Sequence, residues 1–179
     1  PDFSPPMYEY LAPGCRGVGS YGISYARPIG LFLKTQLKTL VVNDARHHDD
    51  PSPELNEHLR ELAERVQTRS MLFCPLVVQG RFRGSLVIHQ TDRVRRWKPD
   101  EIALVESVAA QLATGMAQAE LFEMVARAKR TWEVTFDAMS DGIFIFSNDR
   151  RLVRVNRAGA AMEEATPREL IGRSCCDVL

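Results

Sequence analysis

The chain has 179 residues, of which 45% are hydrophobic and 26% are charged, and this balance excludes an intrinsically disordered protein. Basic and acidic residues number 23 each, so the formal net charge is +0 and no global field attracts nucleic acid or anionic lipid. The longest apolar stretches are far too short to span a bilayer. The four cysteines include no C-x-x-C pair, and this favours buried or unreactive free thiols in a reducing cytosol.

The segment Pro1–Ile29 is rich in glycine and proline and has weak periodicity. Residues Met7–Leu11 suit a strand that a turn would close, and Leu40–Val42 is a short β-branched strand stopped by Asn43 and Asp44. A helix with one apolar stripe should begin at Pro53, because proline suits the first helical position.

The middle of the chain predicts an antiparallel hairpin. Met71–Val78 and Ser85–His89 are apolar runs, and the glycine-bounded segment Gln79–Gly84 between them reads as the turn.

A long helix should follow from Pro99 to Met139, because one glycine, Gly115, costs too little to break it. Its apolar residues recur in alternating steps of three and four, as in a heptad seam. They are Ile102, Val105, Ala109, Leu112, Met116 and Ala119. A second seam begins at Phe122 after a slip of one residue, which we interpret as the point where the helix becomes a connector.

The last third predicts a second hairpin, with strands at Gly142–Ser147 and Arg151–Val155. Asn156 can cap a helix over Arg157–Glu164. Thr166 to Glu169 form a capping box that opens another short helix.

These segments carry two family resemblances. The stretches Leu40–Asp44, Ser70–Leu76, Gly84–Ile88 and Trp97–Ile102 resemble, in order and spacing, the later part of a GAF domain over residues 8–122. Phe136–Ile143, the second hairpin, Val155–Ala158 and Leu170–Arg173 resemble the start of a PAS domain over residues 132–179.

The resemblance implies an α+β fold with antiparallel sheets. It predicts a GAF-like sensory domain at 1–122, incomplete at its N-terminus, a helical linker at 123–135, and the N-terminal part of a PAS-like domain at 136–179. This order is typical of bacterial sensor histidine kinases. The expected function is therefore a cytoplasmic, non-catalytic sensory segment of a two-component signalling protein. It would relay the binding of a small molecule or partner through a homodimer formed along the helix Pro99–Met139.

Candidate ligand-binding residues are Asp44, Cys74 and His89, the last two on opposite strands of the first hairpin. The favoured interpretation of that pair is a small buried thiol and a hydrogen-bonded histidine in the core or at the edge of the sheet. Chromophore-binding GAF domains usually carry a Cys-His pair, and none occurs in this sequence, so a bilin is not predicted. We expect no metal site, since the neighbouring side chains of His47–Asp50 diverge in a solvated loop.

Two enzymatic alternatives stay open at this point. A GAF-type methionine sulfoxide reductase would need Cys15 and Cys74 as its reactive thiols. A nucleotide-binding oxidoreductase would use the G-x-G-x-x-G pattern of Gly17–Gly22 with Asp44. Its helix, however, would contain Pro28 and Gly30, which we expect to break it. Cys175 and Cys176 are expected to be structural thiols.

Overall fold

The computed structural model describes residues 8–15 and 27–178. The chain divides into two compact units, Pro1–Ala119 and Glu120–Leu179. Helix α3 (Pro99–Ala138) belongs to both units and is continuous through Gly115, as predicted. Within the described ranges, no helix combines the length and the apolar character that crossing a membrane requires.

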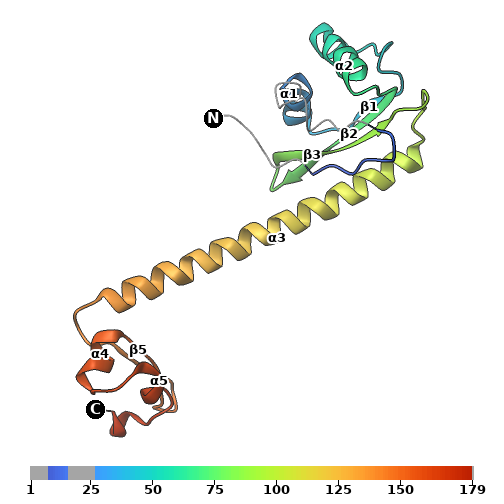
Figure 1. The fold of residues 1–179 in the computed structure, drawn as a ribbon. Helices are drawn as coiled ribbons and strands as arrows, with labels where there is room; N and C mark the ends of the chain where they lie inside the picture. Colours follow the sequence, from blue (N-terminus) through green and yellow to red (C-terminus); the bar gives the residue numbers. More distant parts are fainter. Residues whose placement is uncertain (1–7, 16–26, 179) are drawn as a thin grey trace. The chain divides into compact units, whose positions relative to one another are not determined.

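The first unit is built on a three-stranded antiparallel sheet in the order β1-β2-β3 (Figure 1). The strands are β1 (Leu40–Val42), β2 (Ser70–Val78) and β3 (Arg81–Gln90). The predicted hairpin is confirmed, but its turn is only Gln79 and Gly80. Their φ angles of 51° and 72° suit a two-residue hairpin turn that matches the twist of the strands, so β3 begins four residues earlier than Ser85.

Helices cover both faces of this sheet. Helices α1 (Arg27–Gln36) and α2 (Pro53–Arg65) lie on one face, and the first part of α3 lies on the other (Figure 1). Alternate residues of β2 accordingly enter two separate cores, with Met71 and Phe73 packed toward α1 and α2, and Leu72 and Cys74 packed toward α3.

The prediction that Pro28 and Gly30 prevent a helix is wrong, because both lie within α1. Pro28 occupies the first turn, where no intrahelical partner for an N–H is lost. Gly30 costs the helix about 1 kcal/mol. Burial of Ile29 and Leu33 in the core outweighs that cost, since a fully buried aliphatic side chain contributes roughly 1.5–3 kcal/mol.

The predicted N-terminal strand is also wrong for Tyr8–Leu11, which has no regular structure, while Met7 lies outside the described residues. The helix predicted from Pro53 is confirmed as α2. The Ser52 hydroxyl accepts a hydrogen bond from the N–H of Leu55 at 3.3 Å and caps its first turn.

The second unit contains a two-stranded antiparallel sheet of β4 (Phe144–Phe146) and β5 (Leu152–Val155). Two short helices follow, α4 (Arg157–Met162) and α5 (Pro167–Leu170), and then a 3₁₀ turn at Cys175–Asp177. The predicted strands are confirmed in a shorter form. Their core consists of apolar side chains from both strands and from the segments that follow them: Leu152, Val155, Ala160, Leu170 and Val178.

Candidate functional site

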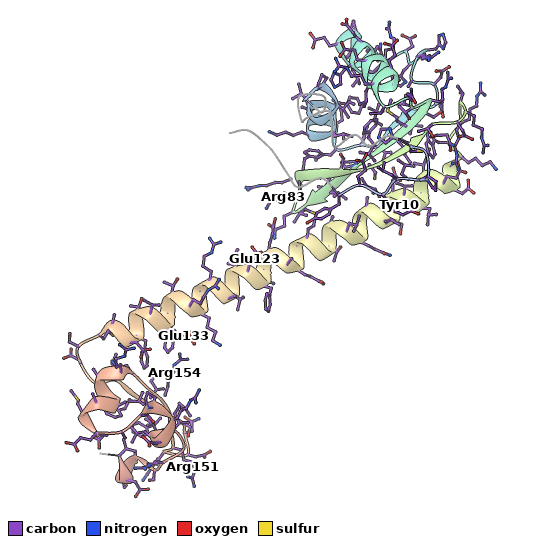
Figure 2. The ribbon with its side chains drawn as sticks, in the orientation of Figure 1. Tyr10, Arg83, Glu123, Glu133, Arg151 and Arg154 are labelled. Carbon is purple, nitrogen blue, oxygen red and sulfur yellow. The ribbon has the colours of Figure 1, made fainter. Side chains whose placement is uncertain are left out.

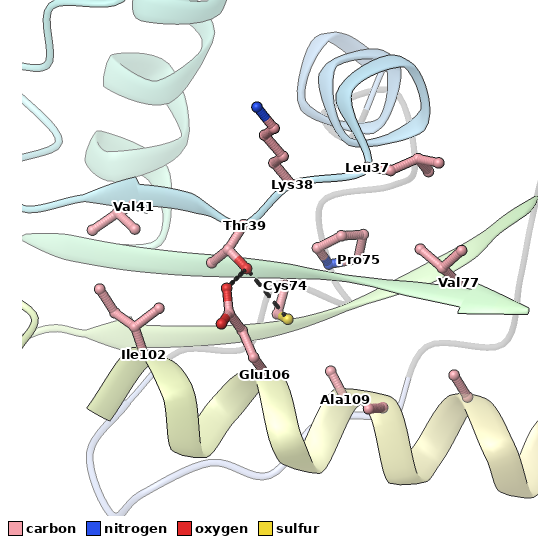
Figure 3. A pocket seen from close by; sticks show the side chains of 12 residues that line it. Leu37, Lys38, Thr39, Val41, Cys74, Pro75, Val77, Ile102, Glu106 and Ala109 are labelled. Carbon is pink, nitrogen blue, oxygen red and sulfur yellow. Dashed lines mark hydrogen bonds between the residues drawn. The ribbon is translucent and has the colours of Figure 1, made fainter. Parts of the chain in front are cut away.

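A groove of about 520 Å³ lies in the first unit between the sheet and α3 (Figure 3). Apolar side chains from the sheet and from the helix form most of its lining. They include Val41, Val77, Ile102, Ala109 and Ala113. The small alanines of α3 leave room here, so the groove exists because the helix presents methyl groups to the sheet.

A polar cluster of Thr39, Cys74 and Glu106 also lines the groove (Figure 3). The Thr39 hydroxyl donates to Oε1 of Glu106 at 2.6 Å, and its oxygen lies 3.6 Å from Sγ of Cys74. A threonine hydroxyl has one hydrogen to donate, and the bond to the charged carboxylate is the stronger one. This bond therefore ties the residue preceding β1 to the surface of α3.

The Cys74 thiol is a poor nucleophile in this setting. Burial raises its pKa above the ordinary value, the Thr39 hydroxyl lowers it in part, and the nearby Glu106 carboxylate raises it again. Because the thiolate is the reactive form of cysteine, the raised pKa disfavours Cys74 as a nucleophile near neutral pH. The groove offers a small molecule apolar walls and a hydroxyl–carboxylate pair.

His89 lies on the other face of the sheet from Cys74. It is opposite Met71 in the β2–β3 register and meets the Phe73 ring edge-on, with the ring centroids 6.3 Å apart. Burial lowers the pKa of His89, and its Nδ1 atom has no hydrogen-bond partner among the described residues. The structure therefore does not bring the two candidate hairpin residues together.

Asp44 occupies a third location, in the turn after β1. Its carboxylate accepts the N–H of Arg46 at 3.0 Å and lies 3.0 Å from Nδ1 of His47. The hydrogen bond to His47 holds the pKa of Asp44 below its ordinary value. Over residues 8–15 and 27–178, no group of three or more His, Cys, Asp or Glu side chains converges as a metal site would require.

The residues that seat α3 on the sheet were not recognised in the sequence. Oδ1 of Asn43 accepts the N–H of Trp97 at 3.0 Å, and the indole N–H of Trp97 donates to the carbonyl of Val42 at 3.3 Å. The Ser70 hydroxyl donates to the carbonyl of Asn43 at 2.6 Å and accepts the N–H of Arg95 at 2.7 Å. These bonds fix the loop that leads into α3.

In the second unit, the C-terminal end of α3 is held by Asn156, whose side chain is fully buried. Its Oδ1 accepts the N–H of Ile143 and, as the predicted cap of α4, the N–H of Gly159, both at 2.8 Å. Its Nδ2 donates toward backbone carbonyls at the end of α3 and in the loop after it. These are Phe136 at 3.2 Å, Met139 at 3.5 Å and Asp141 at 2.8 Å.

Arg154 of β5 makes the second connection to α3. Its guanidinium carbon lies 3.8 Å from the centroid of the Trp132 ring, and Trp132 stacks on Phe136 at 4.7 Å. A guanidinium nitrogen also lies 3.4 Å from a carboxylate oxygen of Glu133 (Figure 2). We refer to Trp132, Glu133, Phe136, Arg154 and Asn156 as the helix anchor.

The first unit is thus an antiparallel sheet between helices with a groove under its last helix, and a second, hairpin-based unit follows. Residues 11–116 match the family model described as the GAF domain, and the chain belongs to this family. Residues 136–179 match the model described as a PAS fold. Both domain types are those that the sequence resemblance predicted. The exact limits of the linker, 123–135, stay a prediction.

Curated relatives are described as the circadian input-output histidine kinase CikA. The protein from Thermosynechococcus vestitus is 31% identical over 99 residues, and that from Synechococcus elongatus is 33% identical over 98 residues. Each match covers 55% of this chain, and the chain spans only 13% and 12% of these relatives.

Two solved structures share the fold of the first unit. GAF3 of Slr1393 from Synechocystis sp. PCC6803 matches with a TM-score of 0.55 and 21% identity, covering 66% of this chain and 77% of that one. The far-red absorbing dark state of JSC1_58120g3 with bound biliverdin matches with a TM-score of 0.52 and 24% identity, covering 64% and 72%.

Proposed function

We propose that this chain is the sensory segment of a cytoplasmic sensor histidine kinase and relays the binding of a small molecule from its GAF domain to its PAS domain. The curated relatives are named as histidine kinases, and this supports the assignment of the whole protein. The observation that carries the relay is the single helix α3, which begins on the GAF sheet and ends in the helix anchor of the PAS unit.

The input site is the groove of the GAF unit. It is lined on one side by the sheet and on the other by Glu106, Ala109 and Ala113 of α3, so a ligand inside it contacts the helix directly. The ligand has a small apolar body and a polar group that replaces or joins the Thr39–Glu106 hydrogen bond. Such a ligand shifts α3 only if it binds two positions of the helix with different affinity. A bilin is not proposed, because the sequence contains no Cys-His pair.

The output of this segment begins at the helix anchor. Asn156 joins the last turn of α3 to the start of β4 and to α4, and Arg154 joins the side of the helix to β5. A rotation or shift of the last turns of α3 therefore strains contacts with the hairpin, and it cannot be absorbed by a free loop. The catalytic part of the kinase is proposed to respond to that change.

We further propose that the protein is a homodimer through α3. The proposed contact residues differ from the heptad positions predicted from the sequence. Val105 and Ala109 are buried against the sheet and are not free to meet a partner, and Ile102 also packs there. The exposed apolar residues of the same stretch are Leu104, Val108 and Leu112, spaced by four. These three positions, followed by Met116, form the proposed seam.

Disulfide cross-linking tests the dimer. Cysteine at Val108, Leu112 or Met116 should give a symmetric linkage under mild oxidation, mapped by mass spectrometry to avoid confusion with the native cysteines. Thr114→Cys is the matched control, since Thr114 is exposed and lies about 200° around the helix from Leu112. Equal linkage at Leu112 and Thr114, or none at the three seam positions, contradicts the seam.

The kinase assignment is tested in the full-length protein by autophosphorylation from ATP. Asn156→Ser should alter the response of the phosphorylation rate to the input ligand while ligand binding to the GAF unit is retained. A protein that incorporates no phosphate, with or without the variant, would contradict the assignment.

The reductase alternative finds no support in the positions of the thiols. Sγ of Cys15 lies 3.6 Å from the Thr91 hydroxyl, whereas Cys74 lies opposite Leu86, five residues earlier on β3. Five residues of strand span roughly 16 Å, so the two thiols do not converge. The dinucleotide alternative rests on Gly17–Gly22, which lies outside the described residues.

A further inference from the structure

Two adjacent cysteines open the 3₁₀ turn at the end of the second unit. Sγ of Cys175 and Sγ of Cys176 are 3.9 Å apart, and Cys176 is exposed while Cys175 is half-buried. Both thiols are free. The sequence alone favoured structural thiols here, but neither cysteine belongs to the buried core of the unit.

The backbone around the pair is fixed from both sides. The N–H of Cys175 donates to the carbonyl of Arg150 at 2.9 Å, and the N–H of Asp177 donates to the carbonyl of Ser174 at 3.0 Å. Val178, immediately after the turn, is buried in the core. The sulfurs are therefore presented together at the surface by a turn that both of its flanks hold in place.

A direct disulfide fits this pair poorly. Adjacent Cα atoms are about 3.8 Å apart across a trans peptide, whereas disulfides usually join Cα atoms about 4.4–6.8 Å apart. A single atom bonded to both sulfurs removes this conflict, because the sulfurs then need not approach to bonding distance. The geometry favours a bridged dithiol over a disulfide.

We propose that Cys175 and Cys176 form a vicinal dithiol site for a trivalent arsenical of the class R–As(OH)₂. Each thiol sulfur forms one As–S bond, each As–O bond breaks, and the two thiol protons leave with the hydroxyls as two water molecules. Arsenic stays trivalent, so the step needs neither an oxidant nor a reductant.

The pair should be selective for this bridging chemistry. The hydrogen bond from Cys175 raises the pKa of Cys176, so the Cys176 thiol reacts slowly with reagents that need a thiolate. The second As–S bond forms within one molecule, and such closure can raise the strength of attachment by a factor of about 10²–10⁴. Cys74 is buried, and Cys15 lies beside the Thr91 hydroxyl, with no second thiol next to it among the residues that the structure describes.

Intact-mass spectrometry of the chain with equimolar phenylarsine oxide, which is the dehydrated form of R–As(OH)₂, tests the site. One adduct per chain should form, map to the peptide containing Cys175 and Cys176, survive about a hundredfold excess of 2-mercaptoethanol, and disappear with 2,3-dimercaptopropanol. Cys175→Ser and Cys176→Ser should each abolish the resistance to the monothiol. Their urea midpoints serve as the control for folding.

Three results overturn the proposal. The adduct maps to Cys15 or Cys74, the wild-type adduct is displaced by the monothiol, or either single serine variant that is still folded keeps a monothiol-resistant adduct.

Discussion

Replacing Asn156 should separate two contributions that one side chain makes to the PAS unit. Serine is as good a helix cap as asparagine, so Asn156→Ser keeps the cap on Gly159. Its shorter side chain cannot reach Ile143, Phe136 or Asp141. Asn156→Ala loses the cap as well. The first variant therefore reports the tie to α3, and the difference between the two reports the cap.

The magnitudes follow from the hydrogen bonds. Asn156→Ser removes three good bonds, each with a net value of about 1 kcal/mol. It leaves the partly buried Ile143 N–H and Asp141 carbonyl and the buried Phe136 carbonyl without this partner. We expect a loss of roughly 2–4 kcal/mol in the free energy of unfolding of this unit. Asn156→Ala should cost about 1 kcal/mol more, the typical value of a cap. Ser52→Ala removes a single cap bond in the first unit and should cost about 1 kcal/mol there.

Hydrogen exchange with peptide-level mass spectrometry reads the two units separately. In Asn156→Ser, protection should fall in the last turns of α3 and around Ile143, with the peptides of β1 and α2 unchanged. Ser52→Ala should show the reverse pattern. If Asn156→Ser costs no more than Ser52→Ala, or leaves the exchange of the last turns of α3 unaltered, then Asn156 is only a cap and the proposed relay loses its connection to the hairpin.

Three further predictions concern single residues. Gly115→Ala should raise stability by up to about 1 kcal/mol, because nothing lies within 4 Å of the added methyl group. Gly159→Ala should lower stability, because its methyl group would lie 2.8 Å from Cγ2 of Val155. Urea unfolding that shows stability changes of the same sign for both variants would contradict this prediction. Burial lowers the pKa of His89 and also that of His58, so the unfolded state takes up protons first as the pH falls below 6.5 and stability should drop. His89 alone contributes at most about 1.4 kcal/mol per pH unit to this drop, and His89→Phe should reduce the slope in urea midpoints by up to that amount. Glu106→Gln removes a charge that raises the pKa of Cys74, so iodoacetamide should alkylate Cys74 faster, within about tenfold, and an unchanged rate would show that burial alone governs the thiol.

Local signals explain which parts of the fold the sequence predicted. The caps at Ser52 and Asn156 act over three residues, and a hairpin depends on two neighbouring segments, so both could be read directly. The capping box behaves in the same way, with the Glu169 carboxylate accepting the N–H of Thr166 at 2.7 Å. Helix α1 was missed because Pro28 and Gly30 disfavour a helix locally, whereas the burial of Ile29 and Leu33 that stabilises it depends on residues far away in the chain.

The candidate site was harder to predict, because its contacts join residues far apart in the chain. Thr39 and Glu106 are 67 positions apart, and neither belongs to a motif that would pair them. Cys74 and His89 lie on adjacent strands, yet an odd-numbered offset in register places them on opposite faces of the sheet. Periodicity revealed the apolar positions of α3. It could not show that Val105 and Ala109 pack against the sheet rather than against a second helix.

Similar hydrogen bonds hold each end of α3, and they support the proposed transmission of a shift along the helix. An asparagine side chain, Asn43 before the helix and Asn156 after it, bonds to backbone groups of the segment that enters or leaves the helix. A backbone partner cannot swing aside as a surface side chain can, so moving a helix end breaks several bonds together. The groove contacts α3 between these two ties, through Glu106 and Ala109. In the proposed relay, a ligand that displaces Glu106 from Thr39 would act on a helix that is held at both ends. The least costly response would then be a change in the anchor contacts of Arg154, which are partly exposed to solvent.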